Sequence, residues 1–326
     1  MTAQVVLPLA DAVLDRVADD VRRGLTAQCK SLPPWLFYDE AGSRLFEQIT
    51  ALPEYYLTRT ERSILTRHAA AIVAGAGDGQ PLRIVELGAG SAAKTLLLLQ
   101  AALDRQPGVV YEPIDVSFSA LETACRQIED EMPRVEVVPR VMDYTCELEF
   151  EPVGHPQRRL VLLIGSSIGN FEPEEAIRLL RRVRSRLRPG DSLLLGVDLT
   201  KESQTLLAAY DDAEGVTAAF NRNVLVRLNR ELGGDFDPGA FAHRALWNPD
   251  ASRIEMHLES LINQTARLGV LDLEVEFAAG ETLHTENSYK FPPGGAEALF
   301  AASGFTPACT WTDPRLWFAV CLGRVK

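Results

Sequence analysis

The sequence predicts an α/β protein with a doubly wound, mostly parallel sheet and a second domain inserted into it. Three observations indicate this arrangement. Short apolar segments alternate with helical segments over residues 82–197. A glycine turn joins the first of these strands to the helix that follows. The alternation then stops over residues 200–289, a stretch too long for a loop, before a final helix and two strands.

Composition narrows the function to small-molecule chemistry. The chain has 326 residues, 46% of them hydrophobic, which is enough for sizeable cores. It contains no run of ~18 apolar residues, so no membrane-spanning helix is expected. The N-terminus lacks a basic leader followed by a long apolar core, so we expect no secretion signal. A net charge of −12 argues against nucleic acid as a partner.

Cysteine and histidine spacing gives no metal site. The five cysteines form no CxxC pair, which favours a reducing cytoplasm without disulfides or zinc. The five histidines form no HExxH or HxxxH pair. We therefore expect a cytoplasmic protein without a bound metal. As a separate expectation, the protein is taken to be a monomer.

Residues 1–62 are expected to form short elements. A helix over 10–25 is followed by a stretch that Pro33, Pro34 and Pro53 interrupt and that is rich in aromatic residues. Such aromatic side chains either cover a core or form a lid over a pocket. A helix from Arg62 leads into the glycine region.

The stretch LRIVELGAGSAAKTLLLL, residues 82–99, predicts a buried strand, a turn at Gly88 and Gly90, and a helix. Ser91 stands where a helix N-cap is expected, and Leu96 and the leucines after it form the helix. A strand, a glycine turn and a helix N-terminus together place free backbone N–H groups beside a ligand.

Three ligand classes use such a turn. GAGSAAKT is close to a phosphate-binding P-loop, but Ala93 stands where that loop has glycine before Lys94. GAGSAA also fits the relaxed dinucleotide fingerprint. Glu86, two residues before Gly88, favours a third class, because an acid followed by a glycine turn resembles motif I of the S-adenosylmethionine-dependent methyltransferases. Asp115, at the end of the next strand, is placed to face ribose hydroxyls. A turn that binds no ligand remains the alternative.

The remaining elements complete the sheet. We expect strands at 109–116, 135–138, 159–164 and 191–197, with helices at 119–131 and 173–187 between them. Helices are expected after residue 200, and antiparallel strands over 257–276. A helix at 294–303 then precedes strands at 306–312 and 317–322. These last two strands form a hairpin that closes a seven-stranded sheet, as in methyltransferases and unlike dinucleotide-binding domains.

Five segments together resemble the L-histidine Nα-methyltransferases of ergothioneine biosynthesis. They are WLFYDEAGSRLFEQITALPEYYLTRTE, IVELGAGSAAKT, IGSSIGNFEP, YDDAEGVTAAFNRNVL and ETLHTENSYKF, and they occur in the family's order along nearly the whole chain. The resemblance implies trimethylation of the histidine α-amino group to hercynine, with S-adenosylmethionine (SAM) as donor. It implies a class I, Rossmann-like domain over 63–199 and 290–326, and a substrate domain over 1–62 and 200–289.

The resemblance also implies site residues. For the cofactor they are Glu86, Gly88, Gly90, Lys94, Asp115, Asp143 and Tyr144. Tyr144 departs from the phenylalanine expected there, although its ring still stacks. Taken alone, Asp143 equally fits the cap of a turn.

For the substrate, the implied residues are Tyr38, Phe46, Tyr55, Gly165, Asn170, Tyr210, Met256, Glu286 and Ser288. Asn170 and Tyr210 are expected to hold the α-carboxylate, and Glu286 and Ser288 the two imidazole nitrogens. Their spacing of two puts both side chains on one face of a strand. Taken alone, Asn170 more often forms an Asx turn, and a Glu–x–Ser strand is more often surface.

The implied mechanism is direct SN2 displacement by the neutral amine, with Tyr38 near that amine as the catalytic residue and alignment as the main contribution of the pocket. Three alternatives remain open at this stage. They are an NAD-dependent oxidoreductase, a non-catalytic protein that binds metabolites, and a methyltransferase for another amino acid.

Overall fold

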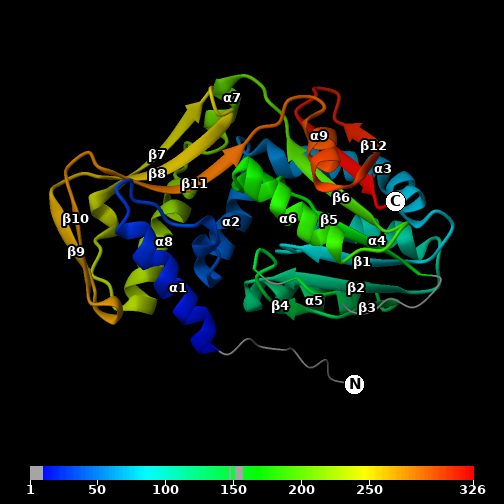
Figure 1. The fold of residues 1–326 in the computed structure, drawn as a ribbon, viewed down its shortest axis with the longest axis horizontal. Coiled ribbons are helices and arrows are strands. Elements are labelled where there is room, and N and C mark those ends of the chain that lie inside the picture. The colour runs from blue at the N-terminus through cyan, green and yellow to red at the C-terminus, as the bar shows by residue number, and fades with distance from the viewer. Residues whose placement is uncertain (1–9, 147, 151–156) are drawn as a thin grey trace. The chain divides into compact units, whose positions relative to one another are not determined.

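A computed structural model describes residues 10–146, 148–150 and 157–326 (Figure 1). The first nine residues, part of the segment judged for a secretion signal, lie outside the described residues. The described chain divides into two compact units, one formed by residues 57–200 and 290–326, the other by the residues up to 56 and by 201–289. Residues 57–62, expected in the substrate domain, belong to the first unit because they begin the continuous helix α3 (Tyr56–Gly77).

Within the described residues, the first unit contains an eight-stranded sheet whose main path has the order β12-β13-β6-β5-β1-β2-β3. The strands are β1 (Leu82–Leu87), β2 (Val109–Asp115), β3 (Val135–Val137), β5 (Arg158–Leu163), β6 (Ser192–Asp198), β12 (Thr306–Thr312) and β13 (Phe318–Arg324). A two-residue strand, β4 (Arg140–Val141), also pairs with β2. The last five strands of the path, from β6 to β3, run parallel, and the β12–β13 hairpin joins β6 antiparallel. The chain reverses its strand order between β1 and β5, where ligands of such sheets bind.

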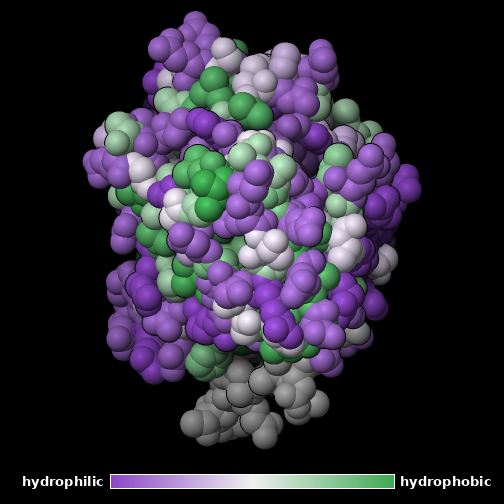
Figure 2. Space-filling view, turned by 90° about the vertical axis from the view of Figure 1, so that its left-hand side faces the viewer, coloured by the Kyte–Doolittle hydropathy of each residue, from purple (hydrophilic) through white to green (hydrophobic). Residues whose placement is uncertain are grey.

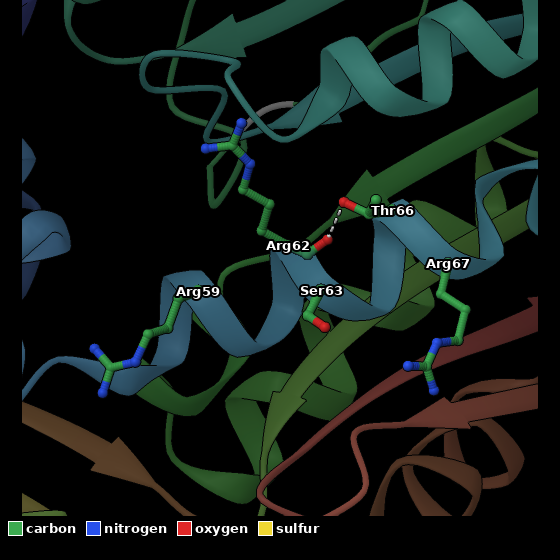
Figure 3. A pocket seen from close by; sticks show the side chains of 5 residues that line it. All are labelled: Arg59, Arg62, Ser63, Thr66 and Arg67. Atoms are coloured by element: carbon green, nitrogen blue, oxygen red, sulfur yellow. Dashed lines mark hydrogen bonds between the residues drawn. The ribbon is translucent and has the colours of Figure 1, made fainter.

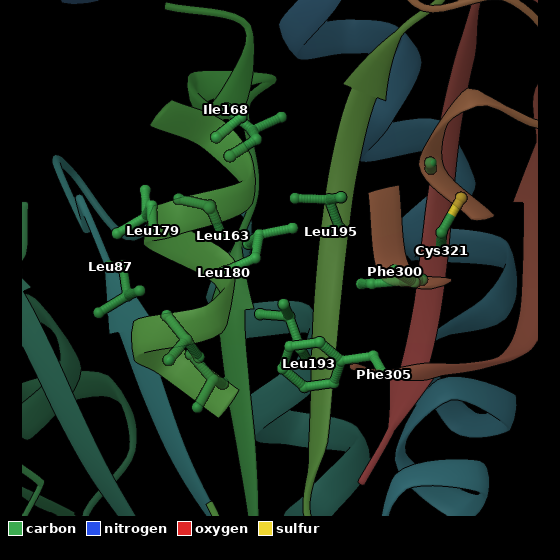
Figure 4. Packing of buried hydrophobic residues seen from close by; sticks show 14 of the residues in the cluster. Leu87, Leu163, Ile168, Leu179, Leu180, Leu193, Leu195, Phe300, Phe305 and Cys321 are labelled. Atoms are coloured by element: carbon green, nitrogen blue, oxygen red, sulfur yellow. The ribbon is translucent and has the colours of Figure 1, made fainter. Parts of the chain in front are cut away.

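The sheet is covered by α3, α4 (Thr95–Leu103), α5 (Phe118–Glu131), α6 (Pro173–Ser185) and α9 (Gly295–Ser303). Strands β1 and β6 are buried on both faces, which explains their nearly continuous apolar runs. In the core shown in Figure 4, Leu163 and Leu195 of the sheet pack against Leu180 of α6 and Phe300 of α9. This core supports the carboxyl ends of β1, β5 and β6.

The turn after β1 is longer than the sequence suggested. The expected N-cap, Ser91, is wrong, because α4 begins four residues later at Thr95. Gly88, Gly90 and Ala92 all have positive φ angles of 73°, 50° and 52°. A helix cannot start while the backbone keeps entering the left-handed region.

The second unit combines helices with two small antiparallel sheets. The helices are α1 (Ala10–Leu25), α2 (Glu40–Ala51), α7 (Ser203–Ala208) and α8 (Val216–Leu232), with short 3₁₀ turns η1 (Pro34–Phe37), η3 (Pro238–Ala240) and η4 (Gly269–Leu271). The strands are β7 (Phe241–Asn248), β8 (Arg253–Ser260), β9 (Gln264–Leu268), β10 (Leu273–Phe277) and β11 (Thr282–Tyr289). They pair in the orders β11-β8-β7 and β10-β9.

Strand β7 lies where helices were expected. Its sequence, FAHRALWN, contains residues that favour helices, but every residue from Phe241 to Asn248 pairs with β8. Pairing with a neighbouring strand therefore overrides the local preference.

The face of this unit seen in Figure 2 is mainly hydrophilic, with separate small groups of apolar side chains. Among the described residues, no helix has the length and hydrophobicity needed to cross a membrane.

Candidate active site

Asp115 braces the glycine turn. Its Oδ2 accepts a hydrogen bond from the Gly90 N–H at 2.9 Å, and its Oδ1 accepts one from the Ser117 N–H at 2.9 Å. Burial raises the pKa of Asp115, although these two hydrogen bonds act in the opposite direction. The turn itself is held to β2 because the Gly88 N–H donates to the carbonyl of Ile114 at 2.8 Å. A partly buried acid thus stands at the carboxyl end of β2, directly beside a turn whose backbone a ligand can approach closely.

Glu86 is an internal anchor. Its side chain is 2% exposed, and its Oε2 accepts hydrogen bonds from the Thr95 hydroxyl at 2.7 Å and from the Tyr111 hydroxyl. It therefore ties the first residue of α4 to β1 and β2. Burial raises the pKa of Glu86 to about 7, against the effect of those two hydrogen bonds. A direct contact between Glu86 and a cofactor stays a prediction.

Replacing Glu86 by glutamine should remove a pH dependence of stability. Folding raises the pKa of the Glu86 carboxyl from 4.5 to about 7, so between these two pH values the folded protein keeps a proton that the unfolded chain releases. The free energy of unfolding therefore falls as the pH rises across this interval, by about 3 kcal/mol in total. Glutamine keeps an acceptor oxygen and does not titrate. Denaturant unfolding measures this between pH 5 and 8: as the pH rises, the free energy of unfolding of the variant should increase relative to that of the unmodified protein. Parallel curves of that free energy against pH would contradict the shifted pKa.

Lys94 and Gly165 meet at Glu61, a residue that the sequence analysis did not select. Glu61 is fully buried, forms an ion pair with Lys94, and accepts the Gly165 N–H with both carboxylate oxygens at 2.9 Å. A Cβ at Gly196 of β6 would lie 2.1 Å from the Glu61 carboxylate, so any side chain there would displace it. Glu61 therefore joins the turn after β1 to the turn after β5. Asn170 follows at the end of the 3₁₀ turn η2 (Ser167–Asn170), in the same unit.

Asp143 and Tyr144 lie after β4. Asp143 Oδ1 accepts the Thr145 N–H at 2.7 Å, which is the turn cap that the sequence allowed. A carboxylate can accept further hydrogen bonds, so the cap is compatible with a contact to an adenine amine. The Tyr144 hydroxyl would lie 3.6 Å from a Cβ at Gly88. Burial, with the carboxylates of Asp115 and Asp143 nearby, raises the pKa of Tyr144, which therefore stays neutral beside the glycine turn.

The second unit gathers the aromatic residues. Tyr38 and Tyr55 flank Phe46, with ring centroids 5.7 and 6.2 Å from it, and Tyr55 lies 6.3 Å from Tyr210. Phe220 of α8, which the sequence analysis quoted without a role, lies 5.9 Å from Tyr38 and 6.0 Å from Phe46. Residues far apart in the chain thus form one aromatic cluster.

Strand β11 carries the pair expected to hold an imidazole. Glu286 and Ser288 are 7% and 3% exposed, so this Glu–x–Ser strand is not surface. Glu286 pairs across the sheet with Met256 of β8, which is 2% exposed. The Ser288 and Tyr210 hydroxyls lie 2.7 Å apart. The unit therefore brings Tyr210, Met256, Glu286 and Ser288 to one buried polar region.

A pocket of about 510 Å³ lies along α3 in the first unit (Figure 3). It is lined by Arg59, Arg62, Ser63, Thr66 and Arg67. The Thr66 hydroxyl donates to the Arg62 carbonyl at 2.8 Å, and the side chain of Arg62 leaves α3 on the opposite side from those of Arg59 and Arg67. None of the predicted site residues lines this pocket, so it is not the candidate site.

The first unit has the parts of one class of enzyme. A parallel sheet closed by an antiparallel hairpin, a glycine turn after β1 and a partly buried acid at the end of β2 define a class I SAM-dependent methyltransferase. The description "Histidine-specific methyltransferase, SAM-dependent" belongs to the family whose sequence model matches residues 17–325. The chain is a member of that family, and SAM is its cofactor. The NAD-dependent alternative is therefore wrong.

Several relatives carry names that agree with this family. Histidine N-alpha-methyltransferase of Mycolicibacterium smegmatis is 48% identical over 96% of this chain and 96% of its own length. The protein of the same name from Mycobacterium tuberculosis is 47% identical over 90% of each chain. Ergothioneine biosynthesis protein 1 of Neurospora crassa is 30% identical over 87% of this chain, which corresponds to 32% of that longer protein.

Proposed function

We propose that this protein trimethylates the α-amino group of L-histidine to hercynine, the first step of ergothioneine biosynthesis. The observation that carries the proposal is the buried Glu286–Ser288 pair on β11, in a chain of a histidine-specific family. An imidazole needs one acceptor and one adaptable hydroxyl, and this pair offers both.

The test is one incubation with labelled SAM and the twenty amino acids, read by mass spectrometry. We expect products carrying one, two and three methyl groups from histidine alone. Methylation of a different amino acid, or SAM binding without any methylated product, would overturn the proposal. The second outcome would favour a protein that binds metabolites without catalysis.

The residues of the first unit fit SAM. Asp115 offers a partly buried carboxylate to ribose hydroxyls, while the glycine turn lets a ligand approach the backbone closely. Lys94 supplies a positive charge for the amino acid carboxylate of the cofactor, and Tyr144 a ring for the adenine. SAM supplies an electrophilic methyl group on its sulfonium. The contributions of the protein are to hold and orient.

For histidine, we propose that Asn170 and Tyr210 hold the α-carboxylate and that Glu286 and Ser288 bind the ring nitrogens. Gly165 is assigned to the same substrate set, and Phe46 and Met256 form apolar walls. Anchoring both ends of the amino acid fixes the amine, and well-oriented partners can save roughly 7–11 kcal/mol of the barrier. We further propose that the protein acts in the cytoplasm as a monomer, which light scattering would test.

We predict that Tyr38→Phe slows methylation about tenfold but leaves histidine affinity within about twofold. Tyr38 and Tyr55 are assigned to the substrate, with Tyr38 near the amine, and the phenol of Tyr38 is expected to orient the lone pair of the amine or relay its proton. Phenylalanine keeps the ring contacts with Phe46 and Phe220. Single-turnover rates and calorimetry separate the two effects, with Tyr289→Phe as a control. An unchanged rate would remove Tyr38 from the mechanism.

A further inference from the structure

A chain of buried polar groups in the second unit starts beside Glu286. The preceding residue, Thr285, is 1% exposed, and its hydroxyl lies 2.8 Å from Asn221 Oδ1 and 3.0 Å from the Met256 carbonyl. Asn221 of α8 is fully buried. Its Nδ2 donates to the carbonyl of His257 at 3.0 Å. Because a hydroxyl donor meets Oδ1 and a carbonyl meets Nδ2, these contacts fix the orientation of the Asn221 amide.

That orientation assigns the tautomer of His243 on β7. Asn221 Nδ2 lies 2.9 Å from His243 Nδ1, and an amide nitrogen can only donate, so Nδ1 is the acceptor. The ring proton therefore sits on Nε2, which donates to the Tyr210 carbonyl at 2.8 Å. Burial lowers the pKa of His243, and the ring stays neutral, as this arrangement requires.

This series of hydrogen-bonded groups also ends on β11, the strand on which it begins. Tyr210 follows the end of α7, in a turn rather than in a strand or helix. Its hydroxyl lies 2.7 Å from Ser288 Oγ, three residues along β11 from Thr285. Hydrogen bonds thus link five residues on β11, α8, β7 and the turn after α7, and the first and the last of them lie on the same strand: Thr285, Asn221, His243, Tyr210 and Ser288.

We infer that His243 is a positioning residue for histidine binding: its Nε2–H holds the Tyr210 backbone so that the phenol stays in register with Ser288. The inference rests on the proposed function, because it acts through two residues assigned to the substrate. Without the donor, the Tyr210 turn loses its link to β7, and the phenol is no longer held at one place. Histidine affinity should then fall while SAM binding by the first unit stays unchanged.

Two variants of His243 separate this role from simple packing. His243→Asn keeps an acceptor oxygen near the position of Nδ1 for the Asn221 amide, but it loses the N–H that donates to the Tyr210 carbonyl. His243→Gln places an amide nitrogen near Nε2 and restores that donor. With S-adenosylhomocysteine at saturation, calorimetry should show roughly tenfold weaker histidine binding for the Asn variant. The Gln variant should bind within about threefold of the unmodified protein. The change should appear in KM more than in kcat, with equal affinity for S-adenosylhomocysteine.

Equal histidine affinity in all three proteins would overturn the inference, as would equal losses in both variants, since packing alone predicts no rescue by glutamine. If the Asn variant does not fold, His243→Met fills the volume without a donor and takes its place. Tyr210→Phe distinguishes the two proposals. If it leaves histidine binding intact, the proposed substrate site fails; if it weakens binding while His243→Asn does not, only the positioning role fails.

Discussion

Histidine binding is expected to weaken by about 2–4 kcal/mol when Glu286 is replaced by alanine, or roughly 30- to 1000-fold in Kd. Glu286 is 7% exposed, so an imidazole N–H that loses this carboxylate has little access to water in compensation. Because Glu286 pairs with Met256 across the sheet, alanine at position 286 would leave the imidazole N–H facing the apolar side chain of Met256. Calorimetry in the presence of S-adenosylhomocysteine gives the affinity directly.

Two controls sharpen that result. Glu286→Gln keeps an acceptor oxygen without its charge and should lose about half as much free energy, because charge-assisted hydrogen bonds are roughly twice as strong as neutral ones. Glu274→Ala, on an exposed position of β10 in the same unit, should bind histidine normally. Unchanged affinity in Glu286→Ala would refute the assignment of the imidazole to β11.

The second large effect is expected on the cofactor. Asp115→Ala should weaken S-adenosylhomocysteine binding by about 2–4 kcal/mol, because two functions are lost together. The ribose loses its carboxylate acceptor, and the Gly90 N–H loses the partner that now holds the turn at 2.9 Å. Fluorescence or calorimetric titration with S-adenosylhomocysteine measures the loss.

The appropriate control is Asp130→Ala, which removes an exposed acid on α5 of the same unit. It changes the net charge by the same amount without touching the turn and should bind like the unmodified protein. Asp115→Asn retains one acceptor oxygen for Gly90 and should fall between the two. An affinity for S-adenosylhomocysteine that is unchanged in Asp115→Ala would separate this residue from the cofactor site.

Local patterns predicted much of the fold. The α1 helix and β12 have the expected bounds, and strands β1, β2, β3, β5 and β6 lie within a residue or two of theirs, whereas the two-residue strand β4 was not predicted. The start of α4 and strand β7 were wrong because each depends on something outside its own sequence. The start of α4 depends on the left-handed backbone that continues up to Ala92. Strand β7 depends on its pairing with β8.

For the candidate site, the motifs identified residues but not their partners. Phe220 was quoted only as part of a longer segment, His243 lies in none of the quoted segments, and a glutamate such as Glu61 on a helix is ordinarily exposed. Glu61 is instead buried, and its partners Lys94 and Gly165 lie 33 and 104 residues away. Pairings over such separations leave no periodic signal, so only their placement in space reveals them.

The sequence by itself determined the sheet, the glycine turn and the family, because burial of strands on both faces and turn chemistry depend on neighbouring residues. Only the tertiary structure decided that Glu86 is shared by Thr95 and Tyr111, that Glu61 joins two turns, and that His243 holds Tyr210. A buried polar group must find its partners wherever the packed elements bring them, since water is absent there. Those partners are set by how the elements pack and not by their order in the chain.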